Sequence, residues 1–302
     1  MSESRLLTII KEITDSSYIG DDCAYLEDLG IVVSQDSLVE DVHFRLSWMT
    51  PKELGIKSML VNVSDILASG AVPAYVTVSL SLPKNFGEGF VKEFYDGVNS
   101  VLLEYGVKVI GGDLTASDKV MVSVCIIGKT LGRNISSRKN AKVGYKIIVA
   151  GNHGSSSAGL LALESGEYDS HFVKSHKAPN LQRDFSNLLA TTVVEDYAMM
   201  DTSDGLADAL YKIAVASGVT LEVDFSKIPY DKELLKLNDY KNLILFGGED
   251  YSLVGVVPEK VVLAGYSVIG TAISPQPEPL VIKYSDRVVK YSSIEEFTYN
   301  HF

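Results

Sequence analysis

Apolar residues along this 302-residue chain follow helical spacing in some segments and form short β-branched runs in others. Helical spacing covers residues 6–13, and a second helix is predicted over residues 89–105. Apolar runs bounded by Gly, Ser or Pro predict strands at residues 31–33, 75–80, 107–110 and 119–127. The first half of the chain is therefore expected to mix helices and strands, with residues 34–37 and 111–113 in loops where strands end.

One helix has a clearly marked start. Thr50 is a favourable N-cap residue, Pro51 stands at the first helical position, and Glu53 completes a capping box. The helix is expected to end near Ser69, because the following Gly70 is a favourable helix stop. These local signals predict both ends of the helix without any knowledge of its surroundings.

A polar and basic run at residues 132–144 separates two halves of the chain. The second half opens with a predicted strand at 146–150, a Gly/Ser-rich turn at 151–157 and a helix at 158–164. Late strands are expected around residues 247–250. Because helices alternate with β-rich runs, we expect two domains of α/β or α+β type, residues 1–138 and 139–302.

Charge and cysteine content narrow the class of protein. The 27 Lys and Arg against 39 Asp and Glu give a formal net charge of −12, which argues against a nucleic-acid binder or a polybasic membrane anchor. No apolar stretch approaches the roughly 18 residues of a membrane span, and the start lacks a signal-peptide layout. Cys23 and Cys125 lie far apart, so neither a zinc site nor a disulfide framework is indicated. We expect a cytoplasmic protein with neither nucleic-acid nor membrane partners.

Acidic residues gather beside Gly or Ser at the ends of predicted strands and helices. They are Asp21, Asp22, Asp36, Asp65, Asp113, Asp201, Asp204, Glu249 and Asp250. Carboxylate oxygens suit Mg²⁺, and converging carboxylates need cations or raised pKa values to relieve their repulsion. Asn62 and Asp65 share one face of the predicted helix. The alternative is that each Asp beside Gly forms only a turn.

Common phosphate-binding and hydrolytic motifs are absent from the sequence. Gly128-Lys129-Thr130 resembles the end of a Walker A loop, but Ser123 stands where that loop needs Gly. No GxSxG, HExxH or kinase-type HRD motif is present. Any nucleotide chemistry would therefore depend on the acidic segments.

Seven short segments, in order along the chain, together resemble the thiamine-monophosphate kinases. They are residues 20–24, 34–39, 61–66, 111–115, 201–206, 247–251 and the ending Tyr299-Asn300-His301-Phe302. The Gly-Asp-Asp opening and Gly111-Gly112-Asp113 are shared with the wider aminoimidazole-ribonucleotide-synthetase-like superfamily. His43, the Gly-Gly-Glu-Asp-Tyr segment and the ending are more specific to the kinases.

This resemblance implies a PurM-like α+β fold in two domains. The N-terminal domain would share a barrel with a second copy in a homodimer, and the C-terminal α/β domain would complete the active site. The implied activity is direct in-line transfer of the γ-phosphoryl group of ATP to thiamine monophosphate, which gives thiamine diphosphate. The implied cofactors are several Mg²⁺ ions, with ATP as co-substrate.

The resemblance also implies residue roles. Metal-ligand positions are Asp22, Ser34, Gln35, Asp36, Asp65, Asp113, Asp201 and Asp204. ATP positions are Tyr95, Gly112, Asp113, Arg138 and Ser203, and thiamine-phosphate positions are His43, Glu249 and Phe297. Gln35 departs from the family's small hydroxyl residue, and Phe297 is the aromatic nearest to a family position that is often Trp. No side chain is implied as acid or base, because metals and Arg138 would neutralise charge.

Two classes of alternative compete with the kinase. The first is another enzyme of the superfamily, which could be a selenophosphate synthetase, a hydrogenase-maturation dehydratase or a purine synthetase. A selenophosphate synthetase needs a reactive Cys in an N-terminal loop, and a hydrogenase-maturation dehydratase ends in Cys. Here no Cys precedes Cys23 and the chain ends in Phe302, so both are disfavoured within the superfamily. A non-catalytic Mg-nucleotide-binding module is the alternative from a different class, although binding alone would not demand so many carboxylates.

Overall fold

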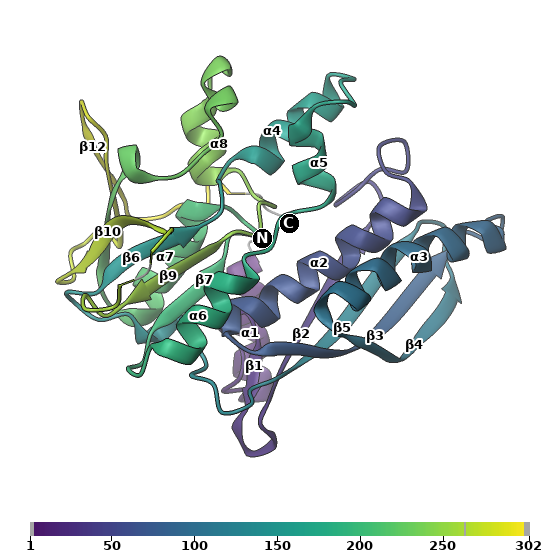
Figure 1. Cartoon of the computed structure of the whole chain (residues 1–302), viewed down its shortest axis with the longest axis horizontal. Helices are drawn as coiled ribbons and strands as arrows, with labels where there is room; N and C mark the ends of the chain where they lie inside the picture. Colours follow the sequence, from purple (N-terminus) through teal and green to yellow (C-terminus); the bar gives the residue numbers. More distant parts are fainter. Residues whose placement is uncertain (1–2, 263, 299–302) are drawn as a thin grey trace.

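The first half of the chain forms a five-stranded sheet in a computed structural model that describes residues 3–262 and 264–298. Its spatial order is β1-β2-β5-β3-β4, with β1 (Ala24–Leu26), β2 (Ile31–Val39), β3 (Val72–Leu82), β4 (Lys108–Ala116) and β5 (Met121–Lys129). The helices of this half are α1 (Glu3–Thr14), α2 (Pro51–Ser69) and α3 (Glu88–Tyr105). Helices α2 and α3 cover one face of the sheet (Figure 1).

The second half forms a seven-stranded sheet. Its order is β12-β11-β8-β10-β6-β9-β7, with β6 (Lys146–Ala150), β7 (Ala198–Asp201), β8 (Thr220–Asp224), β9 (Leu253–Val257), β10 (Ser267–Ile273), β11 (Leu280–Lys283) and β12 (Val288–Tyr291). The helices are α4 (Ser155–Glu164), α5 (His171–Lys177), α6 (Arg183–Thr192), α7 (Leu206–Ser217) and α8 (Tyr240–Phe246). The division between residues 138 and 139 stays a prediction.

Helix α2 is the element that joins the two halves. It packs on β2 and β5 of its own sheet and on β7 and α6 of the other half (Figure 1). The predicted start is confirmed, because the Glu53 amide donates to Thr50 Oγ1 at 3.2 Å and the Thr50 amide donates to Glu53 Oε2 at 2.8 Å. Gly70 ends the helix in the left-handed conformation, as predicted. Because α2 is buried on most sides, it has no polar face turned to solvent, and even Lys57 and Asn62 are fully buried.

Two predicted loops are wrong because each continues as a strand. Residues 34–37 belong to β2, which pairs with β5 over its whole length. Residues 111–113 belong to β4, which pairs in parallel with β3. A Cβ on Gly112 would lie 2.0 Å from the Val78 carbonyl oxygen, so glycine here permits a close strand approach and does not mark a turn.

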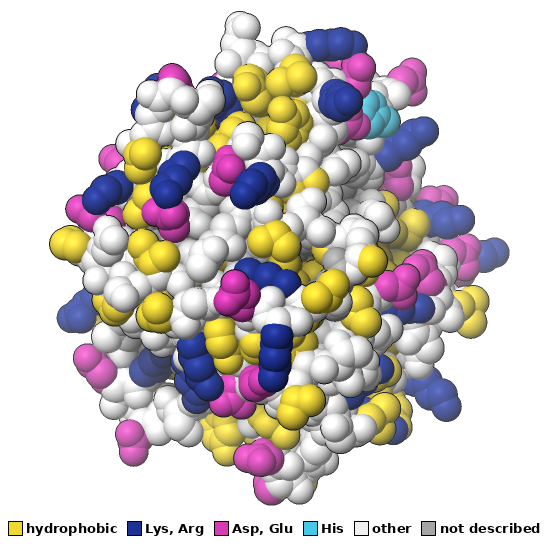
Figure 2. Space-filling view, turned by 60° about the vertical axis from the view of Figure 1, so that its left-hand side comes forward, with side chains coloured by type: hydrophobic (Ala, Val, Ile, Leu, Met, Phe, Trp, Pro, Cys, Tyr) yellow, Lys and Arg dark blue, Asp and Glu magenta, His cyan; other side chains and the backbone are white. Residues whose placement is uncertain are grey.

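Two smaller predictions also need correction. Helix α4 begins at Ser155, within the predicted Gly/Ser-rich turn. The segment before Gly247 is helix α8 where a strand was expected, and only the following β9 is a strand. Among the described residues, no helix combines the length and apolarity needed to cross a membrane. On the face seen in Figure 2, acidic and basic side chains are interspersed.

Helices α2 and α3 cross at unusually short range. A Cβ on Gly97 of α3 would lie 2.0 Å from the Lys52 carbonyl oxygen, and a Cβ on Gly55 of α2 would lie 2.1 Å from the Phe94 carbonyl oxygen. Backbone on each side therefore touches the place where a side chain would begin. The two glycines therefore allow the backbones of α2 and α3 to approach closely.

We expect Gly97→Ala to lower the free energy of unfolding by about 1–3 kcal/mol, because the added methyl group overpacks the crossing. Urea unfolding measures the change. Gly89→Ala on the same helix is the matched control, since nothing lies within 4 Å of its Cβ position and helix propensity favours Ala. Equal stabilities for the two variants would contradict the close crossing.

Candidate active site

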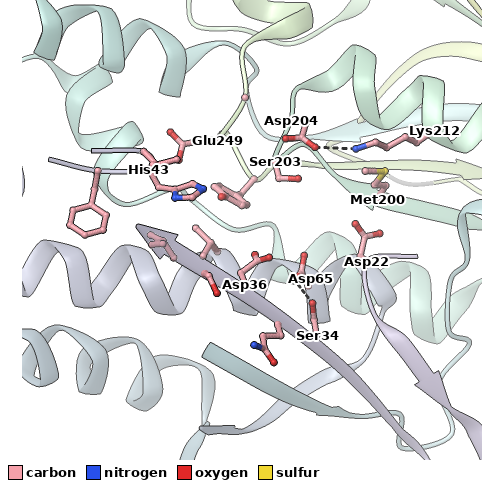
Figure 3. Close-up of a pocket in the computed structure, with 18 of the residues that line it drawn as sticks. Asp22, Ser34, Asp36, His43, Asp65, Met200, Ser203, Asp204, Lys212 and Glu249 are labelled. Carbon is pink, nitrogen blue, oxygen red and sulfur yellow. Dashed lines mark hydrogen bonds and ion pairs between the residues drawn. The ribbon is translucent and has the colours of Figure 1, made fainter. Parts of the chain in front are cut away.

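A cavity of about 850 Å³ is lined by side chains from both halves of the chain. Ten of the sequence-predicted residues border it: Asp22, Ser34, Gln35, Asp36, His43, Asp65, Arg138, Ser203, Asp204 and Glu249. Figure 3 shows the carboxylates of Asp22 and Asp65 at one end of this space and His43 with Glu249 at the other. The fold thus gathers residues that are more than two hundred positions apart, from Asp22 to Glu249.

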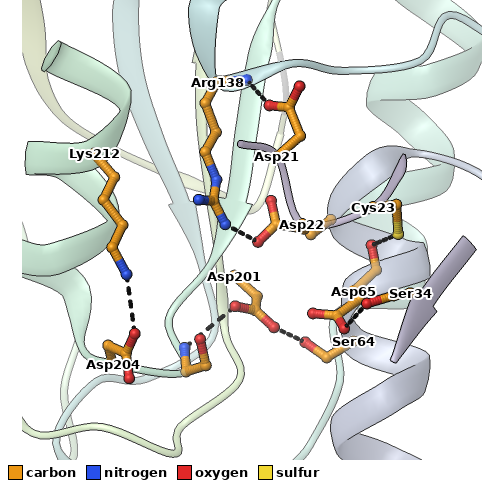
Figure 4. A network of polar contacts seen from close by, with 12 residues as sticks. Asp21, Asp22, Cys23, Ser34, Ser64, Asp65, Arg138, Asp201, Asp204 and Lys212 are labelled. Carbon is orange, nitrogen blue, oxygen red and sulfur yellow. Dashed lines mark hydrogen bonds and ion pairs between the residues drawn. The ribbon is translucent and has the colours of Figure 1, made fainter. Parts of the chain in front are cut away.

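Three carboxylates form the closest acidic group. Single oxygens of Asp22, Asp65 and Asp201 all lie within 4.8 Å of one another. Asp22 comes from the turn after Gly20, Asp65 from α2, and Asp201 from the end of β7 (Figure 4). This spacing matches what several oxygens need to share one hard cation.

Hydroxyl groups orient two of these carboxylates. Ser34 Oγ donates to Asp65 Oδ2 and Ser64 Oγ donates to Asp201 Oδ2, both at 2.6 Å. The Ser203 amide donates to the second oxygen of Asp201 at 3.3 Å. The carboxylates are therefore held by their neighbours and are not free to swing apart.

Burial raises the pKa of four carboxyl groups of the site, Asp22, Asp36, Asp65 and Asp201, and the neighbouring carboxylates add to the effect. The pKa of Asp36 rises to about 6 and that of Asp201 to about 7. The pKa of Asp65 rises well above its ordinary value, and that of Asp22 rises despite the adjacent Arg138. Negative charge here exceeds what the protein's own cations compensate.

Strand β2 places Ser34 and Asp36 on the same side, because alternate residues of a strand share a face. The backbone of Asp36 is tied to α2, since its amide donates to Asn62 Oδ1 at 3.1 Å. Asn62 in turn donates from Nδ2 to the Ser58 carbonyl at 2.9 Å. Asn62 therefore holds β2 against the helix and is a positioning group beside Asp65.

Arg138 is the main cation beside the acidic group. Its Nη2 donates to Asp22 Oδ1 at 2.8 Å, and its backbone amide donates to Asp21 Oδ1 at 2.6 Å. Ser137 Oγ also donates to Asp21, at 2.7 Å. Asp21 thus fixes the chain before Arg138, while the guanidinium faces the cavity (Figure 4).

In the second half of the chain, Lys212 neutralises a second acidic pair, Asp204 and Asp208. Its Nζ lies 3.0 Å from Asp204 Oδ2 and 2.7 Å from Asp208 Oδ2. Burial raises the pKa of Asp208 to about 6, although the Lys212 charge acts in the opposite direction. Ser203, between Asp201 and Asp204, borders the same cavity.

The far end of the cavity carries Glu249, His43 and an aromatic group. Glu249 Oε1 lies 2.9 Å from Lys57 Nζ. Burial acts to raise the Glu249 pKa, but the Lys57 charge and hydrogen bond outweigh it, so the pKa is lowered. His43 Nδ1 accepts the Val39 amide at 3.0 Å. Phe297 stacks on Phe246, a cavity residue, with ring centroids 4.9 Å apart.

Four of the residues predicted to bind metal or ATP are not brought to the acidic group within one chain. Gln35 borders the cavity, but its Nε2 donates to Ser123 Oγ at 3.2 Å, on the face of β2 opposite Ser34 and Asp36. Gly112 and Asp113 lie on the exposed strand β4, and Tyr95 packs edge-on against Phe94 in α3. The ending Tyr299-Asn300-His301-Phe302 lies outside the described residues.

Sequence reasoning missed Ser64, Lys212 and Lys57 as site residues. Ser64 and Lys57 lie on α2, where a polar residue within an otherwise apolar, buried helix was the available signal. Lys212 stands one and two helical turns after Asp208 and Asp204, and this spacing was visible in the sequence.

Comparison with known proteins agrees with the geometry. The family model of the AIR synthase related protein N-terminal domain matches residues 20–130, and that of the C-terminal domain matches residues 142–271. Thiamine-monophosphate kinase of Bacillus subtilis (strain 168) is 38% identical over 251 residues, covering 79% of this chain and 77% of the relative.

Solved structures share the same architecture. The structure of AaThiL complexed with AMPPCP and TMP matches with a TM-score of 0.89 and 30% identity, covering 100% of this chain and 97% of that chain. Hydrogenase maturation protein HypE in complex with ATP matches with a TM-score of 0.71 at 20% identity, covering 97% of this chain and 96% of that one, and shows the fold alone. The chain has a two-domain PurM-like fold of mixed α/β content and belongs to the thiamine-monophosphate kinase family of AIR synthase related proteins.

Proposed function

We propose that this protein phosphorylates thiamine monophosphate at the expense of ATP and yields thiamine diphosphate. The observation that carries the proposal is one cavity with buried carboxylates at one end and Glu249 at the other. Its volume of about 850 Å³ lies in the range of small-molecule sites, about 300–1,000 Å³. The relatives' printed names and the AMPPCP and TMP bound to AaThiL support the same substrates.

The donor set of the acidic group fits Mg²⁺. Its ligand atoms are carboxylate oxygens, and three of them lie within 4.8 Å of one another, as hard-cation ligands do. Burial, and then repulsion between the carboxylates, raises the pKa of Asp201, and a bound cation would relieve this repulsion. Residues that would hold the ions are Asp22, Ser34, Asp36, Asp65, Asp201 and Asp204. Bound there, divalent ions would neutralise phosphate charge, which is most of what catalysis of phosphoryl transfer requires.

The protein's own residues would orient the two phosphates for direct in-line transfer. Arg138 borders the cavity and can hold phosphate oxygens through its planar fork. The attacking phosphate monoester has a second pKa of about 6 and is largely ionised at neutral pH, so no side chain needs to remove a proton. At the far end, Glu249 would accept from the aminopyrimidine while Phe297 would cover the cationic ring.

Purified protein with ATP, Mg²⁺ and thiamine monophosphate is expected to form ADP and thiamine diphosphate. Chromatography measures both products. Asp201→Asn should reduce turnover by about 100-fold or more, because it removes a charge at the centre of the acidic group. Asp196→Asn is the control, since Asp196 is exposed and pairs only loosely with Lys142 at 3.6 Å. Tight binding of both ligands without turnover would instead favour the non-catalytic module.

A second prediction concerns stability without divalent ions. Because native Asp36, Asp65 and Asp201 have raised pKa values, the native state binds more protons than the unfolded state between about pH 4 and 7. With EDTA, stability should therefore fall as pH rises through this range. Asp65→Asn should raise the free energy of unfolding at pH 8 by about 1–3 kcal/mol and flatten this dependence.

Thermal unfolding with and without Mg²⁺ measures this effect. Mg²⁺ should stabilise the wild-type protein more than Asp65→Asn, because the variant lacks one ligand. Glu27→Gln, on the exposed segment after β1, should change neither response. Stability that rises with pH in EDTA would contradict the proposed charge excess.

We also propose the homodimer, which would cover the exposed edge strand β4. All nine residues of β4 are exposed, including Val109, Ile110 and Leu114, and within residues 3–262 and 264–298 its only sheet neighbour is β3. Unpaired edges with apolar side chains favour pairing with another chain. Gly112 and Asp113 lie on this strand, so we propose that they act only in the assembled dimer.

Leu114→Asp is expected to shift the protein from dimer to monomer, because it places a charge in the proposed apolar contact. Light scattering coupled to gel filtration measures the mass. Val194→Asp, at a position that is 90% exposed between α6 and β7, is the control and should stay dimeric. A monomeric wild-type protein would refute the dimer and leave the kinase activity to be judged by its own assay.

A further inference from the structure

A fully buried lysine connects helix α2 with the far end of the cavity. Lys57 has no exposed surface, and its Nζ lies 2.9 Å from Glu249 Oε1 and 3.5 Å from His176 Nε2. His176 Nδ1 in turn lies 3.1 Å from Ser156 Oγ. The contacts run from the first half of the chain to three separate segments of the second half.

Charge in this chain of contacts resides on Lys57 and Glu249. Burial and the Lys57 charge lower the His176 pKa to about 4, so the imidazole is neutral near pH 7. Its Nε2 faces an ammonium and must accept, which puts the proton on Nδ1, beside Ser156 Oγ and 3.4 Å from Glu249 Oε2. Lys57 therefore offers a full positive charge in contact with the Glu249 carboxylate, and burial of that carboxylate makes the contact matter for its charge.

The backbone around Glu249 is held in a conformation that it would not adopt unaided. Glu249 and Tyr251 have positive φ values of 64° and 49°, which are uncommon for residues other than glycine. The Glu249 amide donates to the Ser203 carbonyl at 2.6 Å. Asp250 accepts the amides of Gly154 and Ser156 at 2.5 and 2.8 Å. Each contact fixes the loop from a different side.

Glu249 is nevertheless not closed off from the cavity. Its side chain remains 29% exposed and borders the cavity, whereas Lys57 lies behind it with no exposed surface. Lys57 cannot reach a bound molecule itself, so an effect on binding must pass through the cavity residues that it touches, Glu249 at 2.9 Å and the neutral His176 at 3.5 Å. Of these two, only Glu249 carries a charge that Lys57 compensates. Leaving one buried ion without its partner would be costly, because the remaining charge would have no compensation.

We propose that Lys57 is a positioning residue for substrate recognition: from the opposite domain it keeps Glu249 ionised and oriented as a hydrogen-bond acceptor. This inference rests on the proposed function and deepens it. The group recognised is an N–H donor on a cationic ring system, since an ionised carboxylate accepts and does not donate. Lys57 should then affect the affinity for thiamine monophosphate and not the rate of phosphoryl transfer, although it lies on the same helix as Asp65.

The test compares Lys57→Met, Glu249→Gln and the double variant with wild-type protein, by steady-state kinetics and urea unfolding. Lys57→Met should raise KM for thiamine monophosphate about 30-fold, the typical worth of a hydrogen bond to a charged group. KM for ATP and kcat should change less than about threefold. A purely structural role would move all three together.

Lys177→Met is the matched control. Lys177 on α5 pairs with Glu53 on α2 at 3.0 Å, so it links the same two helices as Lys57 and His176 without touching Glu249. It should leave KM for thiamine monophosphate within about twofold of wild type. A rise equal to that of Lys57→Met would show that α2–α5 contact in general is responsible, and would overturn the proposal.

The double variant keeps the proposal testable if Lys57→Met alone fails to fold. It contains no unpaired charge, so it should unfold at higher urea concentration than Lys57→Met. Its KM for thiamine monophosphate should equal that of Glu249→Gln, because Lys57 acts only through Glu249. A KM about tenfold or more above that of Glu249→Gln would overturn the proposal. Wild-type protein without turnover would overturn the proposed function instead.

Discussion

Mutual repulsion among buried carboxylates is the constraint on which the rest of the structure depends. Asp22, Asp65 and Asp201 approach within 4.8 Å in a site where burial already disfavours their charged forms. The surrounding hydroxyl and amide donors orient the oxygens without supplying positive charge. Under the proposed function this repulsion has a use, since a site that is to receive polyphosphates through cations must first concentrate oxygen ligands.

Helix α2 shows how the scaffold achieves that concentration. It presents Asp65 and Ser64 to the acidic group, Asn62 to the backbone of β2, and Lys57 to Glu249. These residues cover more than one side of the helix, which is possible because α2 is surrounded by both halves of the chain. One helix thus contacts both the acidic end of the cavity and the end that carries Glu249.

The sequence predicted local features wherever the cause was itself local. The capping box at Thr50 and Glu53 and the stop at Gly70 are confirmed, because the atoms that form them are within a few residues of one another. Predictions at residues 34–37 and 111–113 were wrong, because polar and glycine residues there indicated turns while pairing with distant strands extended β2 and β4. Gly112 is needed for contact with Val78, which local sequence cannot show.

Residue chemistry alone indicated carboxylates suited to Mg²⁺, since side-chain type is a property of the sequence itself, and the resemblance of the ordered motifs to the thiamine-monophosphate kinases indicated the family. Which carboxylates meet was decided only by tertiary structure. Asp65 and Asp201 become neighbours through packing of β7 against α2, whereas Asp113, of the same residue type, stays on an exposed edge. The proposed role of Lys57 likewise depends on tertiary structure, because a buried lysine charge must be compensated and only folding brings Glu249 to it.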